Sequence, residues 1–339
     1  MPTWGAILKE IQTESQLHPG APPHDRILKK YLVQLHACTG RNVILYATRW
    51  VQGGVMDGQL VSIVPEDVHA LMEVVHGLDP AKGLDLILHS PGGSPEAAEA
   101  MVHYLRSKFA DIRVIVPQAA MSAATMLSCA ANSIVMGGHS SLGPIDPQMI
   151  LAMPTGTIMA PAQAIIDQFE SARLECQDPK NLGAWIPILP QYGPALLQNS
   201  RNALALAEQL AAEWLRTWMF KDAPDGATKA ASIAKALADH KEFKSHGRPI
   251  HREAAEKMGL VVVRLEDDQQ FQDLTLSVFH TMMHIFAGMP AVAKIVQNHL
   301  GNAFVKLQGV PMPQFIQLPG PPGGAPIAPG ARPQAPPTV

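Results

Sequence analysis

The sequence predicts an α/β protein built on a parallel sheet, and three observations carry that prediction. Short apolar runs at residues 43–47, 84–88 and 112–116 have the composition of strands buried within a parallel sheet. Helical segments separate these runs with short connections, as in repeated β/α units. Turn and cap residues stand at the junctions, so that Ser94 precedes Pro95 where one helix is expected to begin. A chain of 339 residues is long enough to bury a real core.

The elements follow in order from the N-terminus. Residues 1–41 are expected to form a helical N-terminal arm, interrupted by a turn rich in proline and glycine at 18–23. A strand at 43–47 comes next, and Pro65 opens a helix with apolar side chains on one face. The residues expected on that face are Val68, Leu71, Met72 and Val75.

A regular alternation then occupies the centre of the chain. The predicted elements are strand 84–88, helix 95–108, strand 112–116, helix 121–131 and strand 133–136. After Gln148 the pattern loosens into an apolar segment punctuated by prolines. The elements expected beyond it are a helix from about 194 to 220, a helix at 227–238 and a strand at 261–263.

These elements divide the chain into four predicted parts. The N-terminal arm, 1–41, precedes a central α/β domain at 42–265. Residues 266–310 are predicted to be a C-terminal helical appendage. Residues 311–339 are dominated by proline, glycine and alanine, which predicts a disordered tail.

Composition excludes several classes of function. Charged residues make up 16% of the chain and the net charge is −3, which favours neither nucleic-acid binding nor a basic membrane-binding patch. No apolar run reaches the ~18 residues of a transmembrane helix, and the N-terminus lacks the pattern of a secretory signal. The three cysteines are widely spaced and suggest neither disulfides nor a zinc site, so we expect a cytoplasmic protein. No metal site or nucleotide motif stands out, and no cofactor is predicted.

Two breaks that follow predicted strands carry the chemistry. The first is Ser90-Pro91-Gly92-Gly93, where two residues without a Cβ allow unusual backbone angles and close approach. The second runs from Met121 to Thr125 and places Ser122 near the N-terminus of a helix, where free N–H groups favour negative charge. Acyl transfer by serine needs a hydroxyl at such a turn and N–H donors for the oxyanion. The two breaks therefore predict the two halves of one acyl-transfer site.

The same two motifs resemble those of a known family. The run from Leu86 to Ser94, followed one β/α unit later by 120–125, is similar to the Clp-protease and signal-peptide-peptidase (SppA) branch of the ClpP/crotonase fold. The segments 114–122 and 142–148 resemble more narrowly the serine dehydrogenase proteinases, which are ClpP-class proteins. The resemblance covers roughly residues 42–263. It implies a ClpP/crotonase-like spiral of β/α repeats, with 42–265 as the catalytic domain.

The resemblance also implies roles for particular residues. Ser122 matches the nucleophile, the N–H groups of Gly93 and Ala123 match the oxyanion hole, and Gly92 shapes the loop. The general base is less clear, because the position of the Clp-protease histidine corresponds here to Ile145 or Asp146. SppA-like relatives use a lysine, for which the candidate is Lys180. A second candidate base is His246, because the third triad member of Clp proteases comes from the corresponding stretch, from which His246 or Lys244 could reach the site.

Three functions remain open at this point. The first is a serine peptidase of the ClpP/SppA type, acting on a peptide or protein through an acyl-enzyme at Ser122. The second is a crotonase-like enzyme that uses the same oxyanion hole on an acyl-thioester, and the third is a non-catalytic scaffold with the ClpP fold. In the last case Ser122 would be an ordinary helix cap, and Asp146 a turn former or local ion partner. Relatives of this fold build rings, so the resemblance also implies a homo-oligomer.

Overall fold

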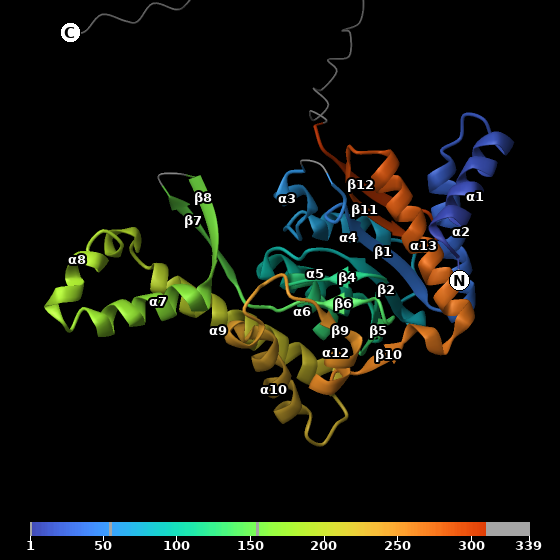
Figure 1. Cartoon of the computed structure of the whole chain (residues 1–339). Helices are drawn as coiled ribbons and strands as arrows, with labels where there is room; N and C mark the ends of the chain where they lie inside the picture. The colour runs from blue at the N-terminus through green and yellow to red at the C-terminus, as the bar shows by residue number, and fades with distance from the viewer. Residues whose placement is uncertain (1, 54–55, 154–155, 310–339) are drawn as a thin grey trace, which may run out of the picture. The chain divides into compact units, whose positions relative to one another are not determined.

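A seven-stranded sheet organises the part of the chain that the computed structural model describes, residues 2–53, 56–153 and 156–309. The strand order is β10-β5-β3-β2-β1-β11-β12 (Figure 1). The five strands from β10 to β1 are parallel, whereas β11 and β12 are antiparallel to their neighbours. The bounds are β1 (Asn42–Thr48), β2 (Leu84–His89), β3 (Ile112–Val116), β5 (Ser133–Met136), β10 (Val262–Arg264), β11 (Val292–Asn298) and β12 (Ala303–Leu307). The predicted α/β class with a parallel sheet is confirmed.

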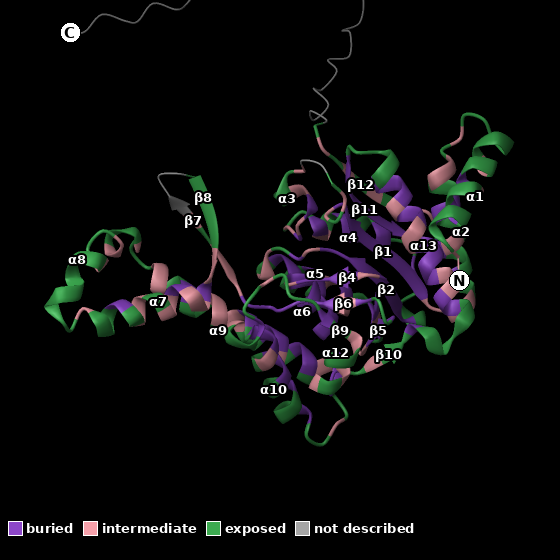
Figure 2. Ribbon diagram, viewed as in Figure 1, coloured by how far each residue is buried: buried purple, intermediate pink, exposed green. Residues whose placement is uncertain are grey.

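Helices cover both faces of this sheet. Alternate side chains of a strand point to opposite faces, so that Leu86 and Leu88 of β2 enter one core cluster and Ile87 the other. The first cluster is completed by α4 (Asp67–Val75), α5 (Pro95–Lys108), α6 (Ala123–Cys129), α9 (Leu196–Trp214) and α10 (Gly226–Ala238). The second is completed by α2 (Pro23–Thr39) and α13 (Gln269–Gly288). Figure 2 shows the central strands as buried between these layers.

The local signals of the central repeats locate their elements well. Helix α5 and strands β3 and β5 have the predicted bounds. Ser94 caps α5 as expected, since its Oγ accepts a hydrogen bond from the N–H of Ala97 at 3.0 Å. In α4 one expectation was wrong, because Met72 is 54% exposed while Leu71 and Val75 are buried. Ala70 and Val74 take its place on the buried face.

The predicted C-terminal helical appendage is correct only for α13. Residues 292–298 and 303–307 are strands, and β11 lies beside β1 in the main sheet. Pro290 follows the end of α13, and proline cannot continue a helix. The β-branched residues Val292, Ile295 and Val296 are buried, which suits a strand between two helical layers. All described residues up to 308 belong to one compact unit, and the predicted tail at 311–339 lies outside the described residues.

The loosened segment after Gln148 forms a hairpin and short helices. Strands β7 (Gln148–Met153) and β8 (Gly156–Pro161) pair in a separate antiparallel sheet. The chain then continues through α7 (Ala162–Glu175), η2 (Pro179–Asn181), α8 (Leu182–Trp185) and η3 (Leu189–Gln191) into α9. Much of this segment is exposed in Figure 2. The remaining elements are α1 (Trp4–Leu17), α3 (Gly58–Val61), η1 (Pro80–Lys82), β4 (Ala119–Ala120), β6 (Ser141–Leu142), the π-helical turn η4 (Leu215–Met219), α11 (His240–Phe243), β9 (Ile250–His251), α12 (Arg252–Met258) and η5 (Leu265–Asp267).

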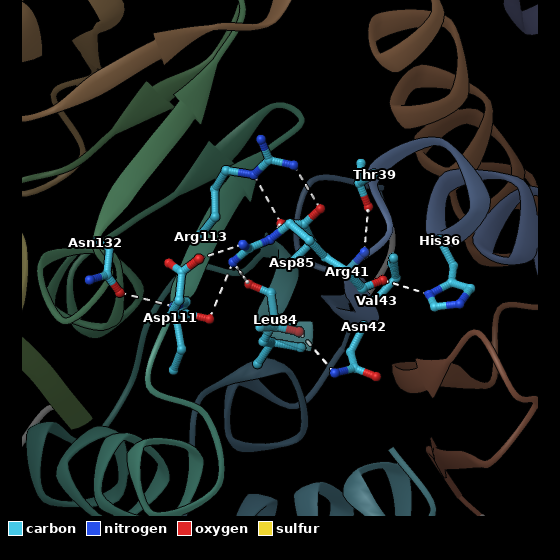
Figure 3. A network of polar contacts seen from close by, with 12 residues as sticks. His36, Thr39, Arg41, Asn42, Val43, Leu84, Asp85, Asp111, Arg113 and Asn132 are labelled. Atoms are coloured by element: carbon cyan, nitrogen blue, oxygen red, sulfur yellow. Dashed lines mark hydrogen bonds and ion pairs between the residues drawn. The ribbon is translucent and has the colours of Figure 1, made fainter. Parts of the chain in front are cut away.

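A buried carboxylate ties strands together at the amino ends of β2 and β3 (Figure 3). Asp85 is fully buried, and its carboxylate accepts hydrogen bonds from Arg41 Nε at 2.7 Å and from Arg113 Nη2 at 2.8 Å. Arg41 also bonds the carboxylate of Asp111. The network therefore neutralises a charge that would otherwise be costly to bury. It lies at the end of β2 opposite to Ser90-Pro91-Gly92-Gly93.

Among the described residues, none of the helices combines the length and the apolar character that crossing a membrane requires.

Candidate active site

The two breaks predicted from the sequence meet in the structure. Ser90 and Ala120 form a parallel bridge, in which the N–H of Met121 donates to the carbonyl of Ser90 at 2.9 Å. The N–H of Ser90 in turn donates to the carbonyl of Ala119 at 3.2 Å. These bonds fix the loop after β2 against the turn that leads into α6. We call residues 90–93 the oxyanion loop.

Ser122 occupies a strained position at the start of α6. Its backbone angles are φ 52° and ψ −120°, and its side chain makes no capping hydrogen bond. A residue other than glycine at positive φ is uncommon, costs about 1–2 kcal/mol and is concentrated at functional sites. The residue is half-buried, so that its hydroxyl is reachable. The geometry therefore does not support the interpretation of Ser122 as an ordinary helix cap.

Gly92 lies directly against the serine turn. It has φ 96°, and a Cβ added to it would lie 2.5 Å from the carbonyl oxygen of Met121, 2.7 Å from Ser122 Cβ and 2.8 Å from the nitrogen of Ala123. Real Cβ atoms do not approach other atoms this closely. The glycine is thus required both by its backbone angle and by the absence of space.

The two predicted oxyanion donors are unpaired. Gly93 forms a parallel bridge with Ile63, but the bonds run from Ile63 N to the carbonyl of Gly92 at 2.7 Å and from Ser94 N to the carbonyl of Ile63 at 3.0 Å. Within the part of the chain that the structure describes, neither Gly93 N–H nor Ala123 N–H has an acceptor. Gly93 is exposed, so its N–H is open to a substrate.

A buried carboxylate joins two histidines in the segments that flank β6 and β9. Asp146 is 1% exposed and accepts hydrogen bonds from His246 Nδ1 at 2.6 Å and from His240 Nδ1 at 2.9 Å. An ionised carboxylate only accepts, so Nδ1 is the donor in each of these bonds, and Nε2 is then the acceptor nitrogen of a ring in its neutral form. Gln148 also donates to this carboxylate, at 3.0 Å. Asp146 thus accepts hydrogen bonds from three side chains.

The backbone connects this cluster to the serine turn. Strand β6 pairs with β4 on one side and with β9 on the other. Asp146 follows β6 and His246 precedes β9. Gly143, which lies between β6 and Asp146, packs tightly on Met121: an added Cβ would lie 2.6 Å from Met121 Cε. Thr125 Oγ1 bonds both the N–H of Gly143, at 3.0 Å, and the carbonyl of Ala120, at 2.8 Å.

The other candidate bases are placed differently. Lys180 is exposed on η2, where its N–H donates to the side chain of Asp178. Lys244 is exposed at the end of α11, at φ 62°. Of the three basic side chains, His246 alone has a carboxylate partner among the described residues. The structure thus brings Gly92 of the oxyanion loop against Ser122 and Ala123. It gives His246 a carboxylate partner at Asp146 and leaves Lys180 on an exposed turn.

His240 and His89 were not singled out from the sequence. His240 follows Asp239, which caps α11, and this signal indicates only a helix start. His89 ends β2, is fully buried and packs against Trp50 and Phe279. Neither of its ring nitrogens makes a hydrogen bond among the described residues, and burial lowers its pKa to about 3, offset only slightly by the nearby carbonyl of Ala119. His89 is on the face of the sheet that α13 covers, which makes it a neutral core residue.

Comparisons with known proteins agree with this geometry. The family model of ClpP-like SDH-type serine proteinases matches residues 34–173. An uncharacterized protein of Methanocaldococcus jannaschii, MJ0137, is 29% identical over 59% of this chain and 60% of its own length. A second one from that organism, MJ1495, is 33% identical over 26% of this chain and 30% of its own length. The chain thus spans less than two thirds of either relative.

Among solved structures, a mutant of the 1510-N membrane-bound stomatin-specific protease is similar with a TM-score of 0.34 and 17% identity, covering 60% of this chain and 75% of that one. The resemblance found in the sequence motifs is confirmed by the family match, which contains both breaks. Over residues 34–173, the chain is thus similar to the ClpP-like SDH-type serine proteinases.

Proposed function

We propose that this protein is a serine peptidase in which Ser122 forms the acyl-enzyme. The observation that carries the proposal is the strained turn at Ser122, φ 52°, with Gly92 packed against it and with the N–H groups of Gly93 and Ala123 without acceptors in the described part of the chain. Such N–H groups, held in place before the reaction, stabilise the charge that develops on a carbonyl oxygen under attack. The family match supports the same chemistry.

His246 is the general base of this proposal, with Asp146 as the residue that orients it. The bond from Nδ1 to Asp146 fixes the tautomer in which Nε2 accepts a proton. The carboxylate also stabilises the imidazolium that forms. His240 binds the same carboxylate through the same nitrogen and provides a matched comparison.

The proposed reaction has two steps. In the first, Ser122 Oγ bonds to the carbonyl carbon of a peptide while its proton moves to His246 Nε2, and the oxyanion accepts hydrogen bonds from Gly93 and Ala123. The peptide C–N bond then breaks, and the departing amine takes the proton from Nε2. In the second step, a water molecule gives a proton to Nε2 while its oxygen bonds to the acyl carbon. The bond from that carbon to Ser122 Oγ then breaks, and Oγ takes the proton back from Nε2.

A fluorophosphonate probe tests the nucleophile. We expect the probe to label the wild type and not the Ser122→Ala variant. Absence of labelling in the wild type, with a native fold shown by circular dichroism, would favour the non-catalytic scaffold. Labelling that survives in Ser122→Ala would exclude Ser122. An acyl-thioester that binds equally well to both proteins would favour the crotonase-like alternative.

The matched pair His246→Ala and His240→Ala tests the base. Loss of a general base costs about 10²–10⁴-fold in rate, so we expect His246→Ala to lower the labelling rate by at least 100-fold. His240→Ala removes a bond to the same carboxylate and should lower it less than tenfold. A larger loss of labelling rate in His240→Ala than in His246→Ala would identify His240 as the base. Equally small losses in both variants would exclude both histidines as the base. We also propose that the substrate is a peptide or protein. We further propose a homo-oligomer, and analytical ultracentrifugation tests that oligomeric state.

A further inference from the structure

A buried ion pair from a distant part of the chain stands behind the oxyanion loop. We propose that Lys294 and Asp67 are positioning residues, which hold the oxyanion loop in place through the segment 62–64. This inference rests on the proposed function, because it concerns the same donors. It assigns a positioning role to two charged residues that lie outside the two sequence motifs. Lys294 also lies outside the segment that matches the family.

The ion pair is hydrogen-bonded to the backbone at both ends of the segment 62–64. Lys294 Nζ donates to the carbonyl of Ser62 at 2.9 Å and to the carboxylate of Asp67. The other oxygen of that carboxylate accepts from the N–H of Val64 at 2.9 Å. Tyr46 donates its hydroxyl to the same oxygen at 2.8 Å. The backbone on either side of Ile63 is therefore fixed by charged groups.

Ile63 transmits this fixation to the glycines. It is fully buried, and its two backbone bonds go to Gly92 and Ser94, one on each side of Gly93. A Cβ on Gly93 would lie 2.3 Å from the carbonyl oxygen and 2.4 Å from the nitrogen of Ile63, so the two backbones are in direct contact. A displacement of residues 62–64 would therefore displace Gly93, whose N–H is a proposed oxyanion donor.

The charges of Lys294 and Asp67 strengthen their hydrogen bonds to residues 62–64. Lys294 is 0% exposed and Asp67 is 1% exposed, and the ammonium group also lies 5.3 Å from the centre of the Tyr46 ring. Burial lowers the pKa of Lys294, and the negative charge of Asp67 opposes that change. A charge–charge hydrogen bond in the interior is shorter and stronger than a neutral one. If either partner moved away, the other would be left as an unpaired charge in the protein interior.

The test compares two double variants that each neutralise an ion pair with a buried carboxylate. Asp67→Asn with Lys294→Met removes the pair behind the loop. Asp85→Asn with Arg113→Met removes a pair at the opposite end of β2, and serves as the control for general loss of stability. Each protein is measured for the fluorophosphonate labelling rate per folded molecule, with the folded fraction taken from urea denaturation. Hydrogen exchange of the Ile63 and Ser94 amides, which make the bonds to the loop, is measured in parallel.

We expect the variant at Asp67 and Lys294 to be labelled about 10–100-fold more slowly than the control, since a misplacement of about 1 Å costs on the order of 100-fold. Its Ile63 and Ser94 amides should exchange faster than in the control. Equal labelling rates and equal exchange in the two double variants would overturn the inference while leaving the proposed function intact. If the wild type is not labelled, the proposed function fails, and exchange of the two amides still decides whether the pair holds the loop.

A milder pair of variants covers the case in which the double variant does not fold. Tyr46→Phe removes only the hydroxyl that donates to Asp67 and leaves every charge paired. Its matched control is Tyr31→Phe, which removes a hydroxyl that donates to Glu10 between α1 and α2. We expect slower labelling and faster exchange of the Ile63 amide in Tyr46→Phe than in Tyr31→Phe. No difference between them would count against the positioning role.

Discussion

Replacing Gly92 by alanine is the sharpest perturbation that the site offers. Two costs act together at this position. Placing a residue with a Cβ at φ 96° costs about 1–2 kcal/mol. The new methyl group also overlaps the backbone of Met121 and Ala123, and such overpacking costs about 1–3 kcal/mol. We therefore expect Gly92→Ala to lower the free energy of unfolding by about 2–5 kcal/mol, within the 5–15 kcal/mol that a typical domain has.

Gly20 provides a control that separates the two costs. It has φ 88°, close to that of Gly92, and a Cβ on it would meet nothing within 4 Å. Gly20→Ala should therefore lose only about 1–2 kcal/mol, from the backbone angle alone. The difference between the two variants in urea denaturation measures the overlap at the serine turn.

The functional consequence is measured with the same two variants. The overlap in Gly92→Ala can be relieved only by moving the oxyanion loop or the turn at Ser122. Loss of one oxyanion donor costs about 10²–10³-fold in rate, so we expect fluorophosphonate labelling per folded molecule to fall at least 100-fold. Gly20→Ala should be labelled at the wild-type rate. If Gly92→Ala is labelled as fast as Gly20→Ala, the loop does not deliver the donors to Ser122, and the reasoning is refuted.

Three further predictions concern residues around the site. Lys180→Ala should leave the labelling rate within twofold of wild type, because that side chain is exposed on η2; a 100-fold loss would assign it the role of base. Thr125→Val should lower the free energy of unfolding by about 1–3 kcal/mol in urea denaturation, since the N–H of Gly143 loses its buried acceptor; an unchanged value would contradict this. His89 has a pKa of about 3 in the folded protein, below its ordinary value of 6.5, so protons bind preferentially to the unfolded chain and stability is lost as the pH falls below about 6.5. Between pH 7.5 and 5 this loss amounts to about 2 kcal/mol, and a His89→Phe variant should lack it when both proteins are compared by urea denaturation.

The sequence was sufficient where the determining interactions are local. The start of α5 is set by Ser94 and Pro95, which act on the next turn of the same helix, and its predicted bounds are correct. The serine turn follows directly from a strand and precedes a short helix, and it could be located for the same reason. Both breaks are signals carried within about ten residues.

Non-local pairing explains what could not be predicted. Strand β11 is stabilised by pairing with β1, in which Ile44 lies opposite Asn298. The two strands are far apart in the sequence, and the residues around β11 do not indicate this pairing. The carboxylate at Asp146 meets His240 and His246 across 94 and 100 residues. His240 therefore shows no sign of this partner in its sequence neighbourhood, and His246 was a candidate only through the family resemblance. The buried Lys294 is a similar case, since its sequence context shows only a strand.

The distance along the chain between Asp67 and Lys294 has a consequence for biosynthesis. The two residues are 227 positions apart, and the bond from Lys294 to the carbonyl of Ser62 spans 232. A nascent chain that has emerged only as far as α12 contains Ser122, both glycines and both histidines, yet it lacks the lysine that completes the support behind the loop. Domains begin to fold from the N-terminus during translation, whereas contacts of long sequence separation form late. On the proposals made above, β11 therefore finishes the site, and we expect no hydrolysis until synthesis has passed Lys294.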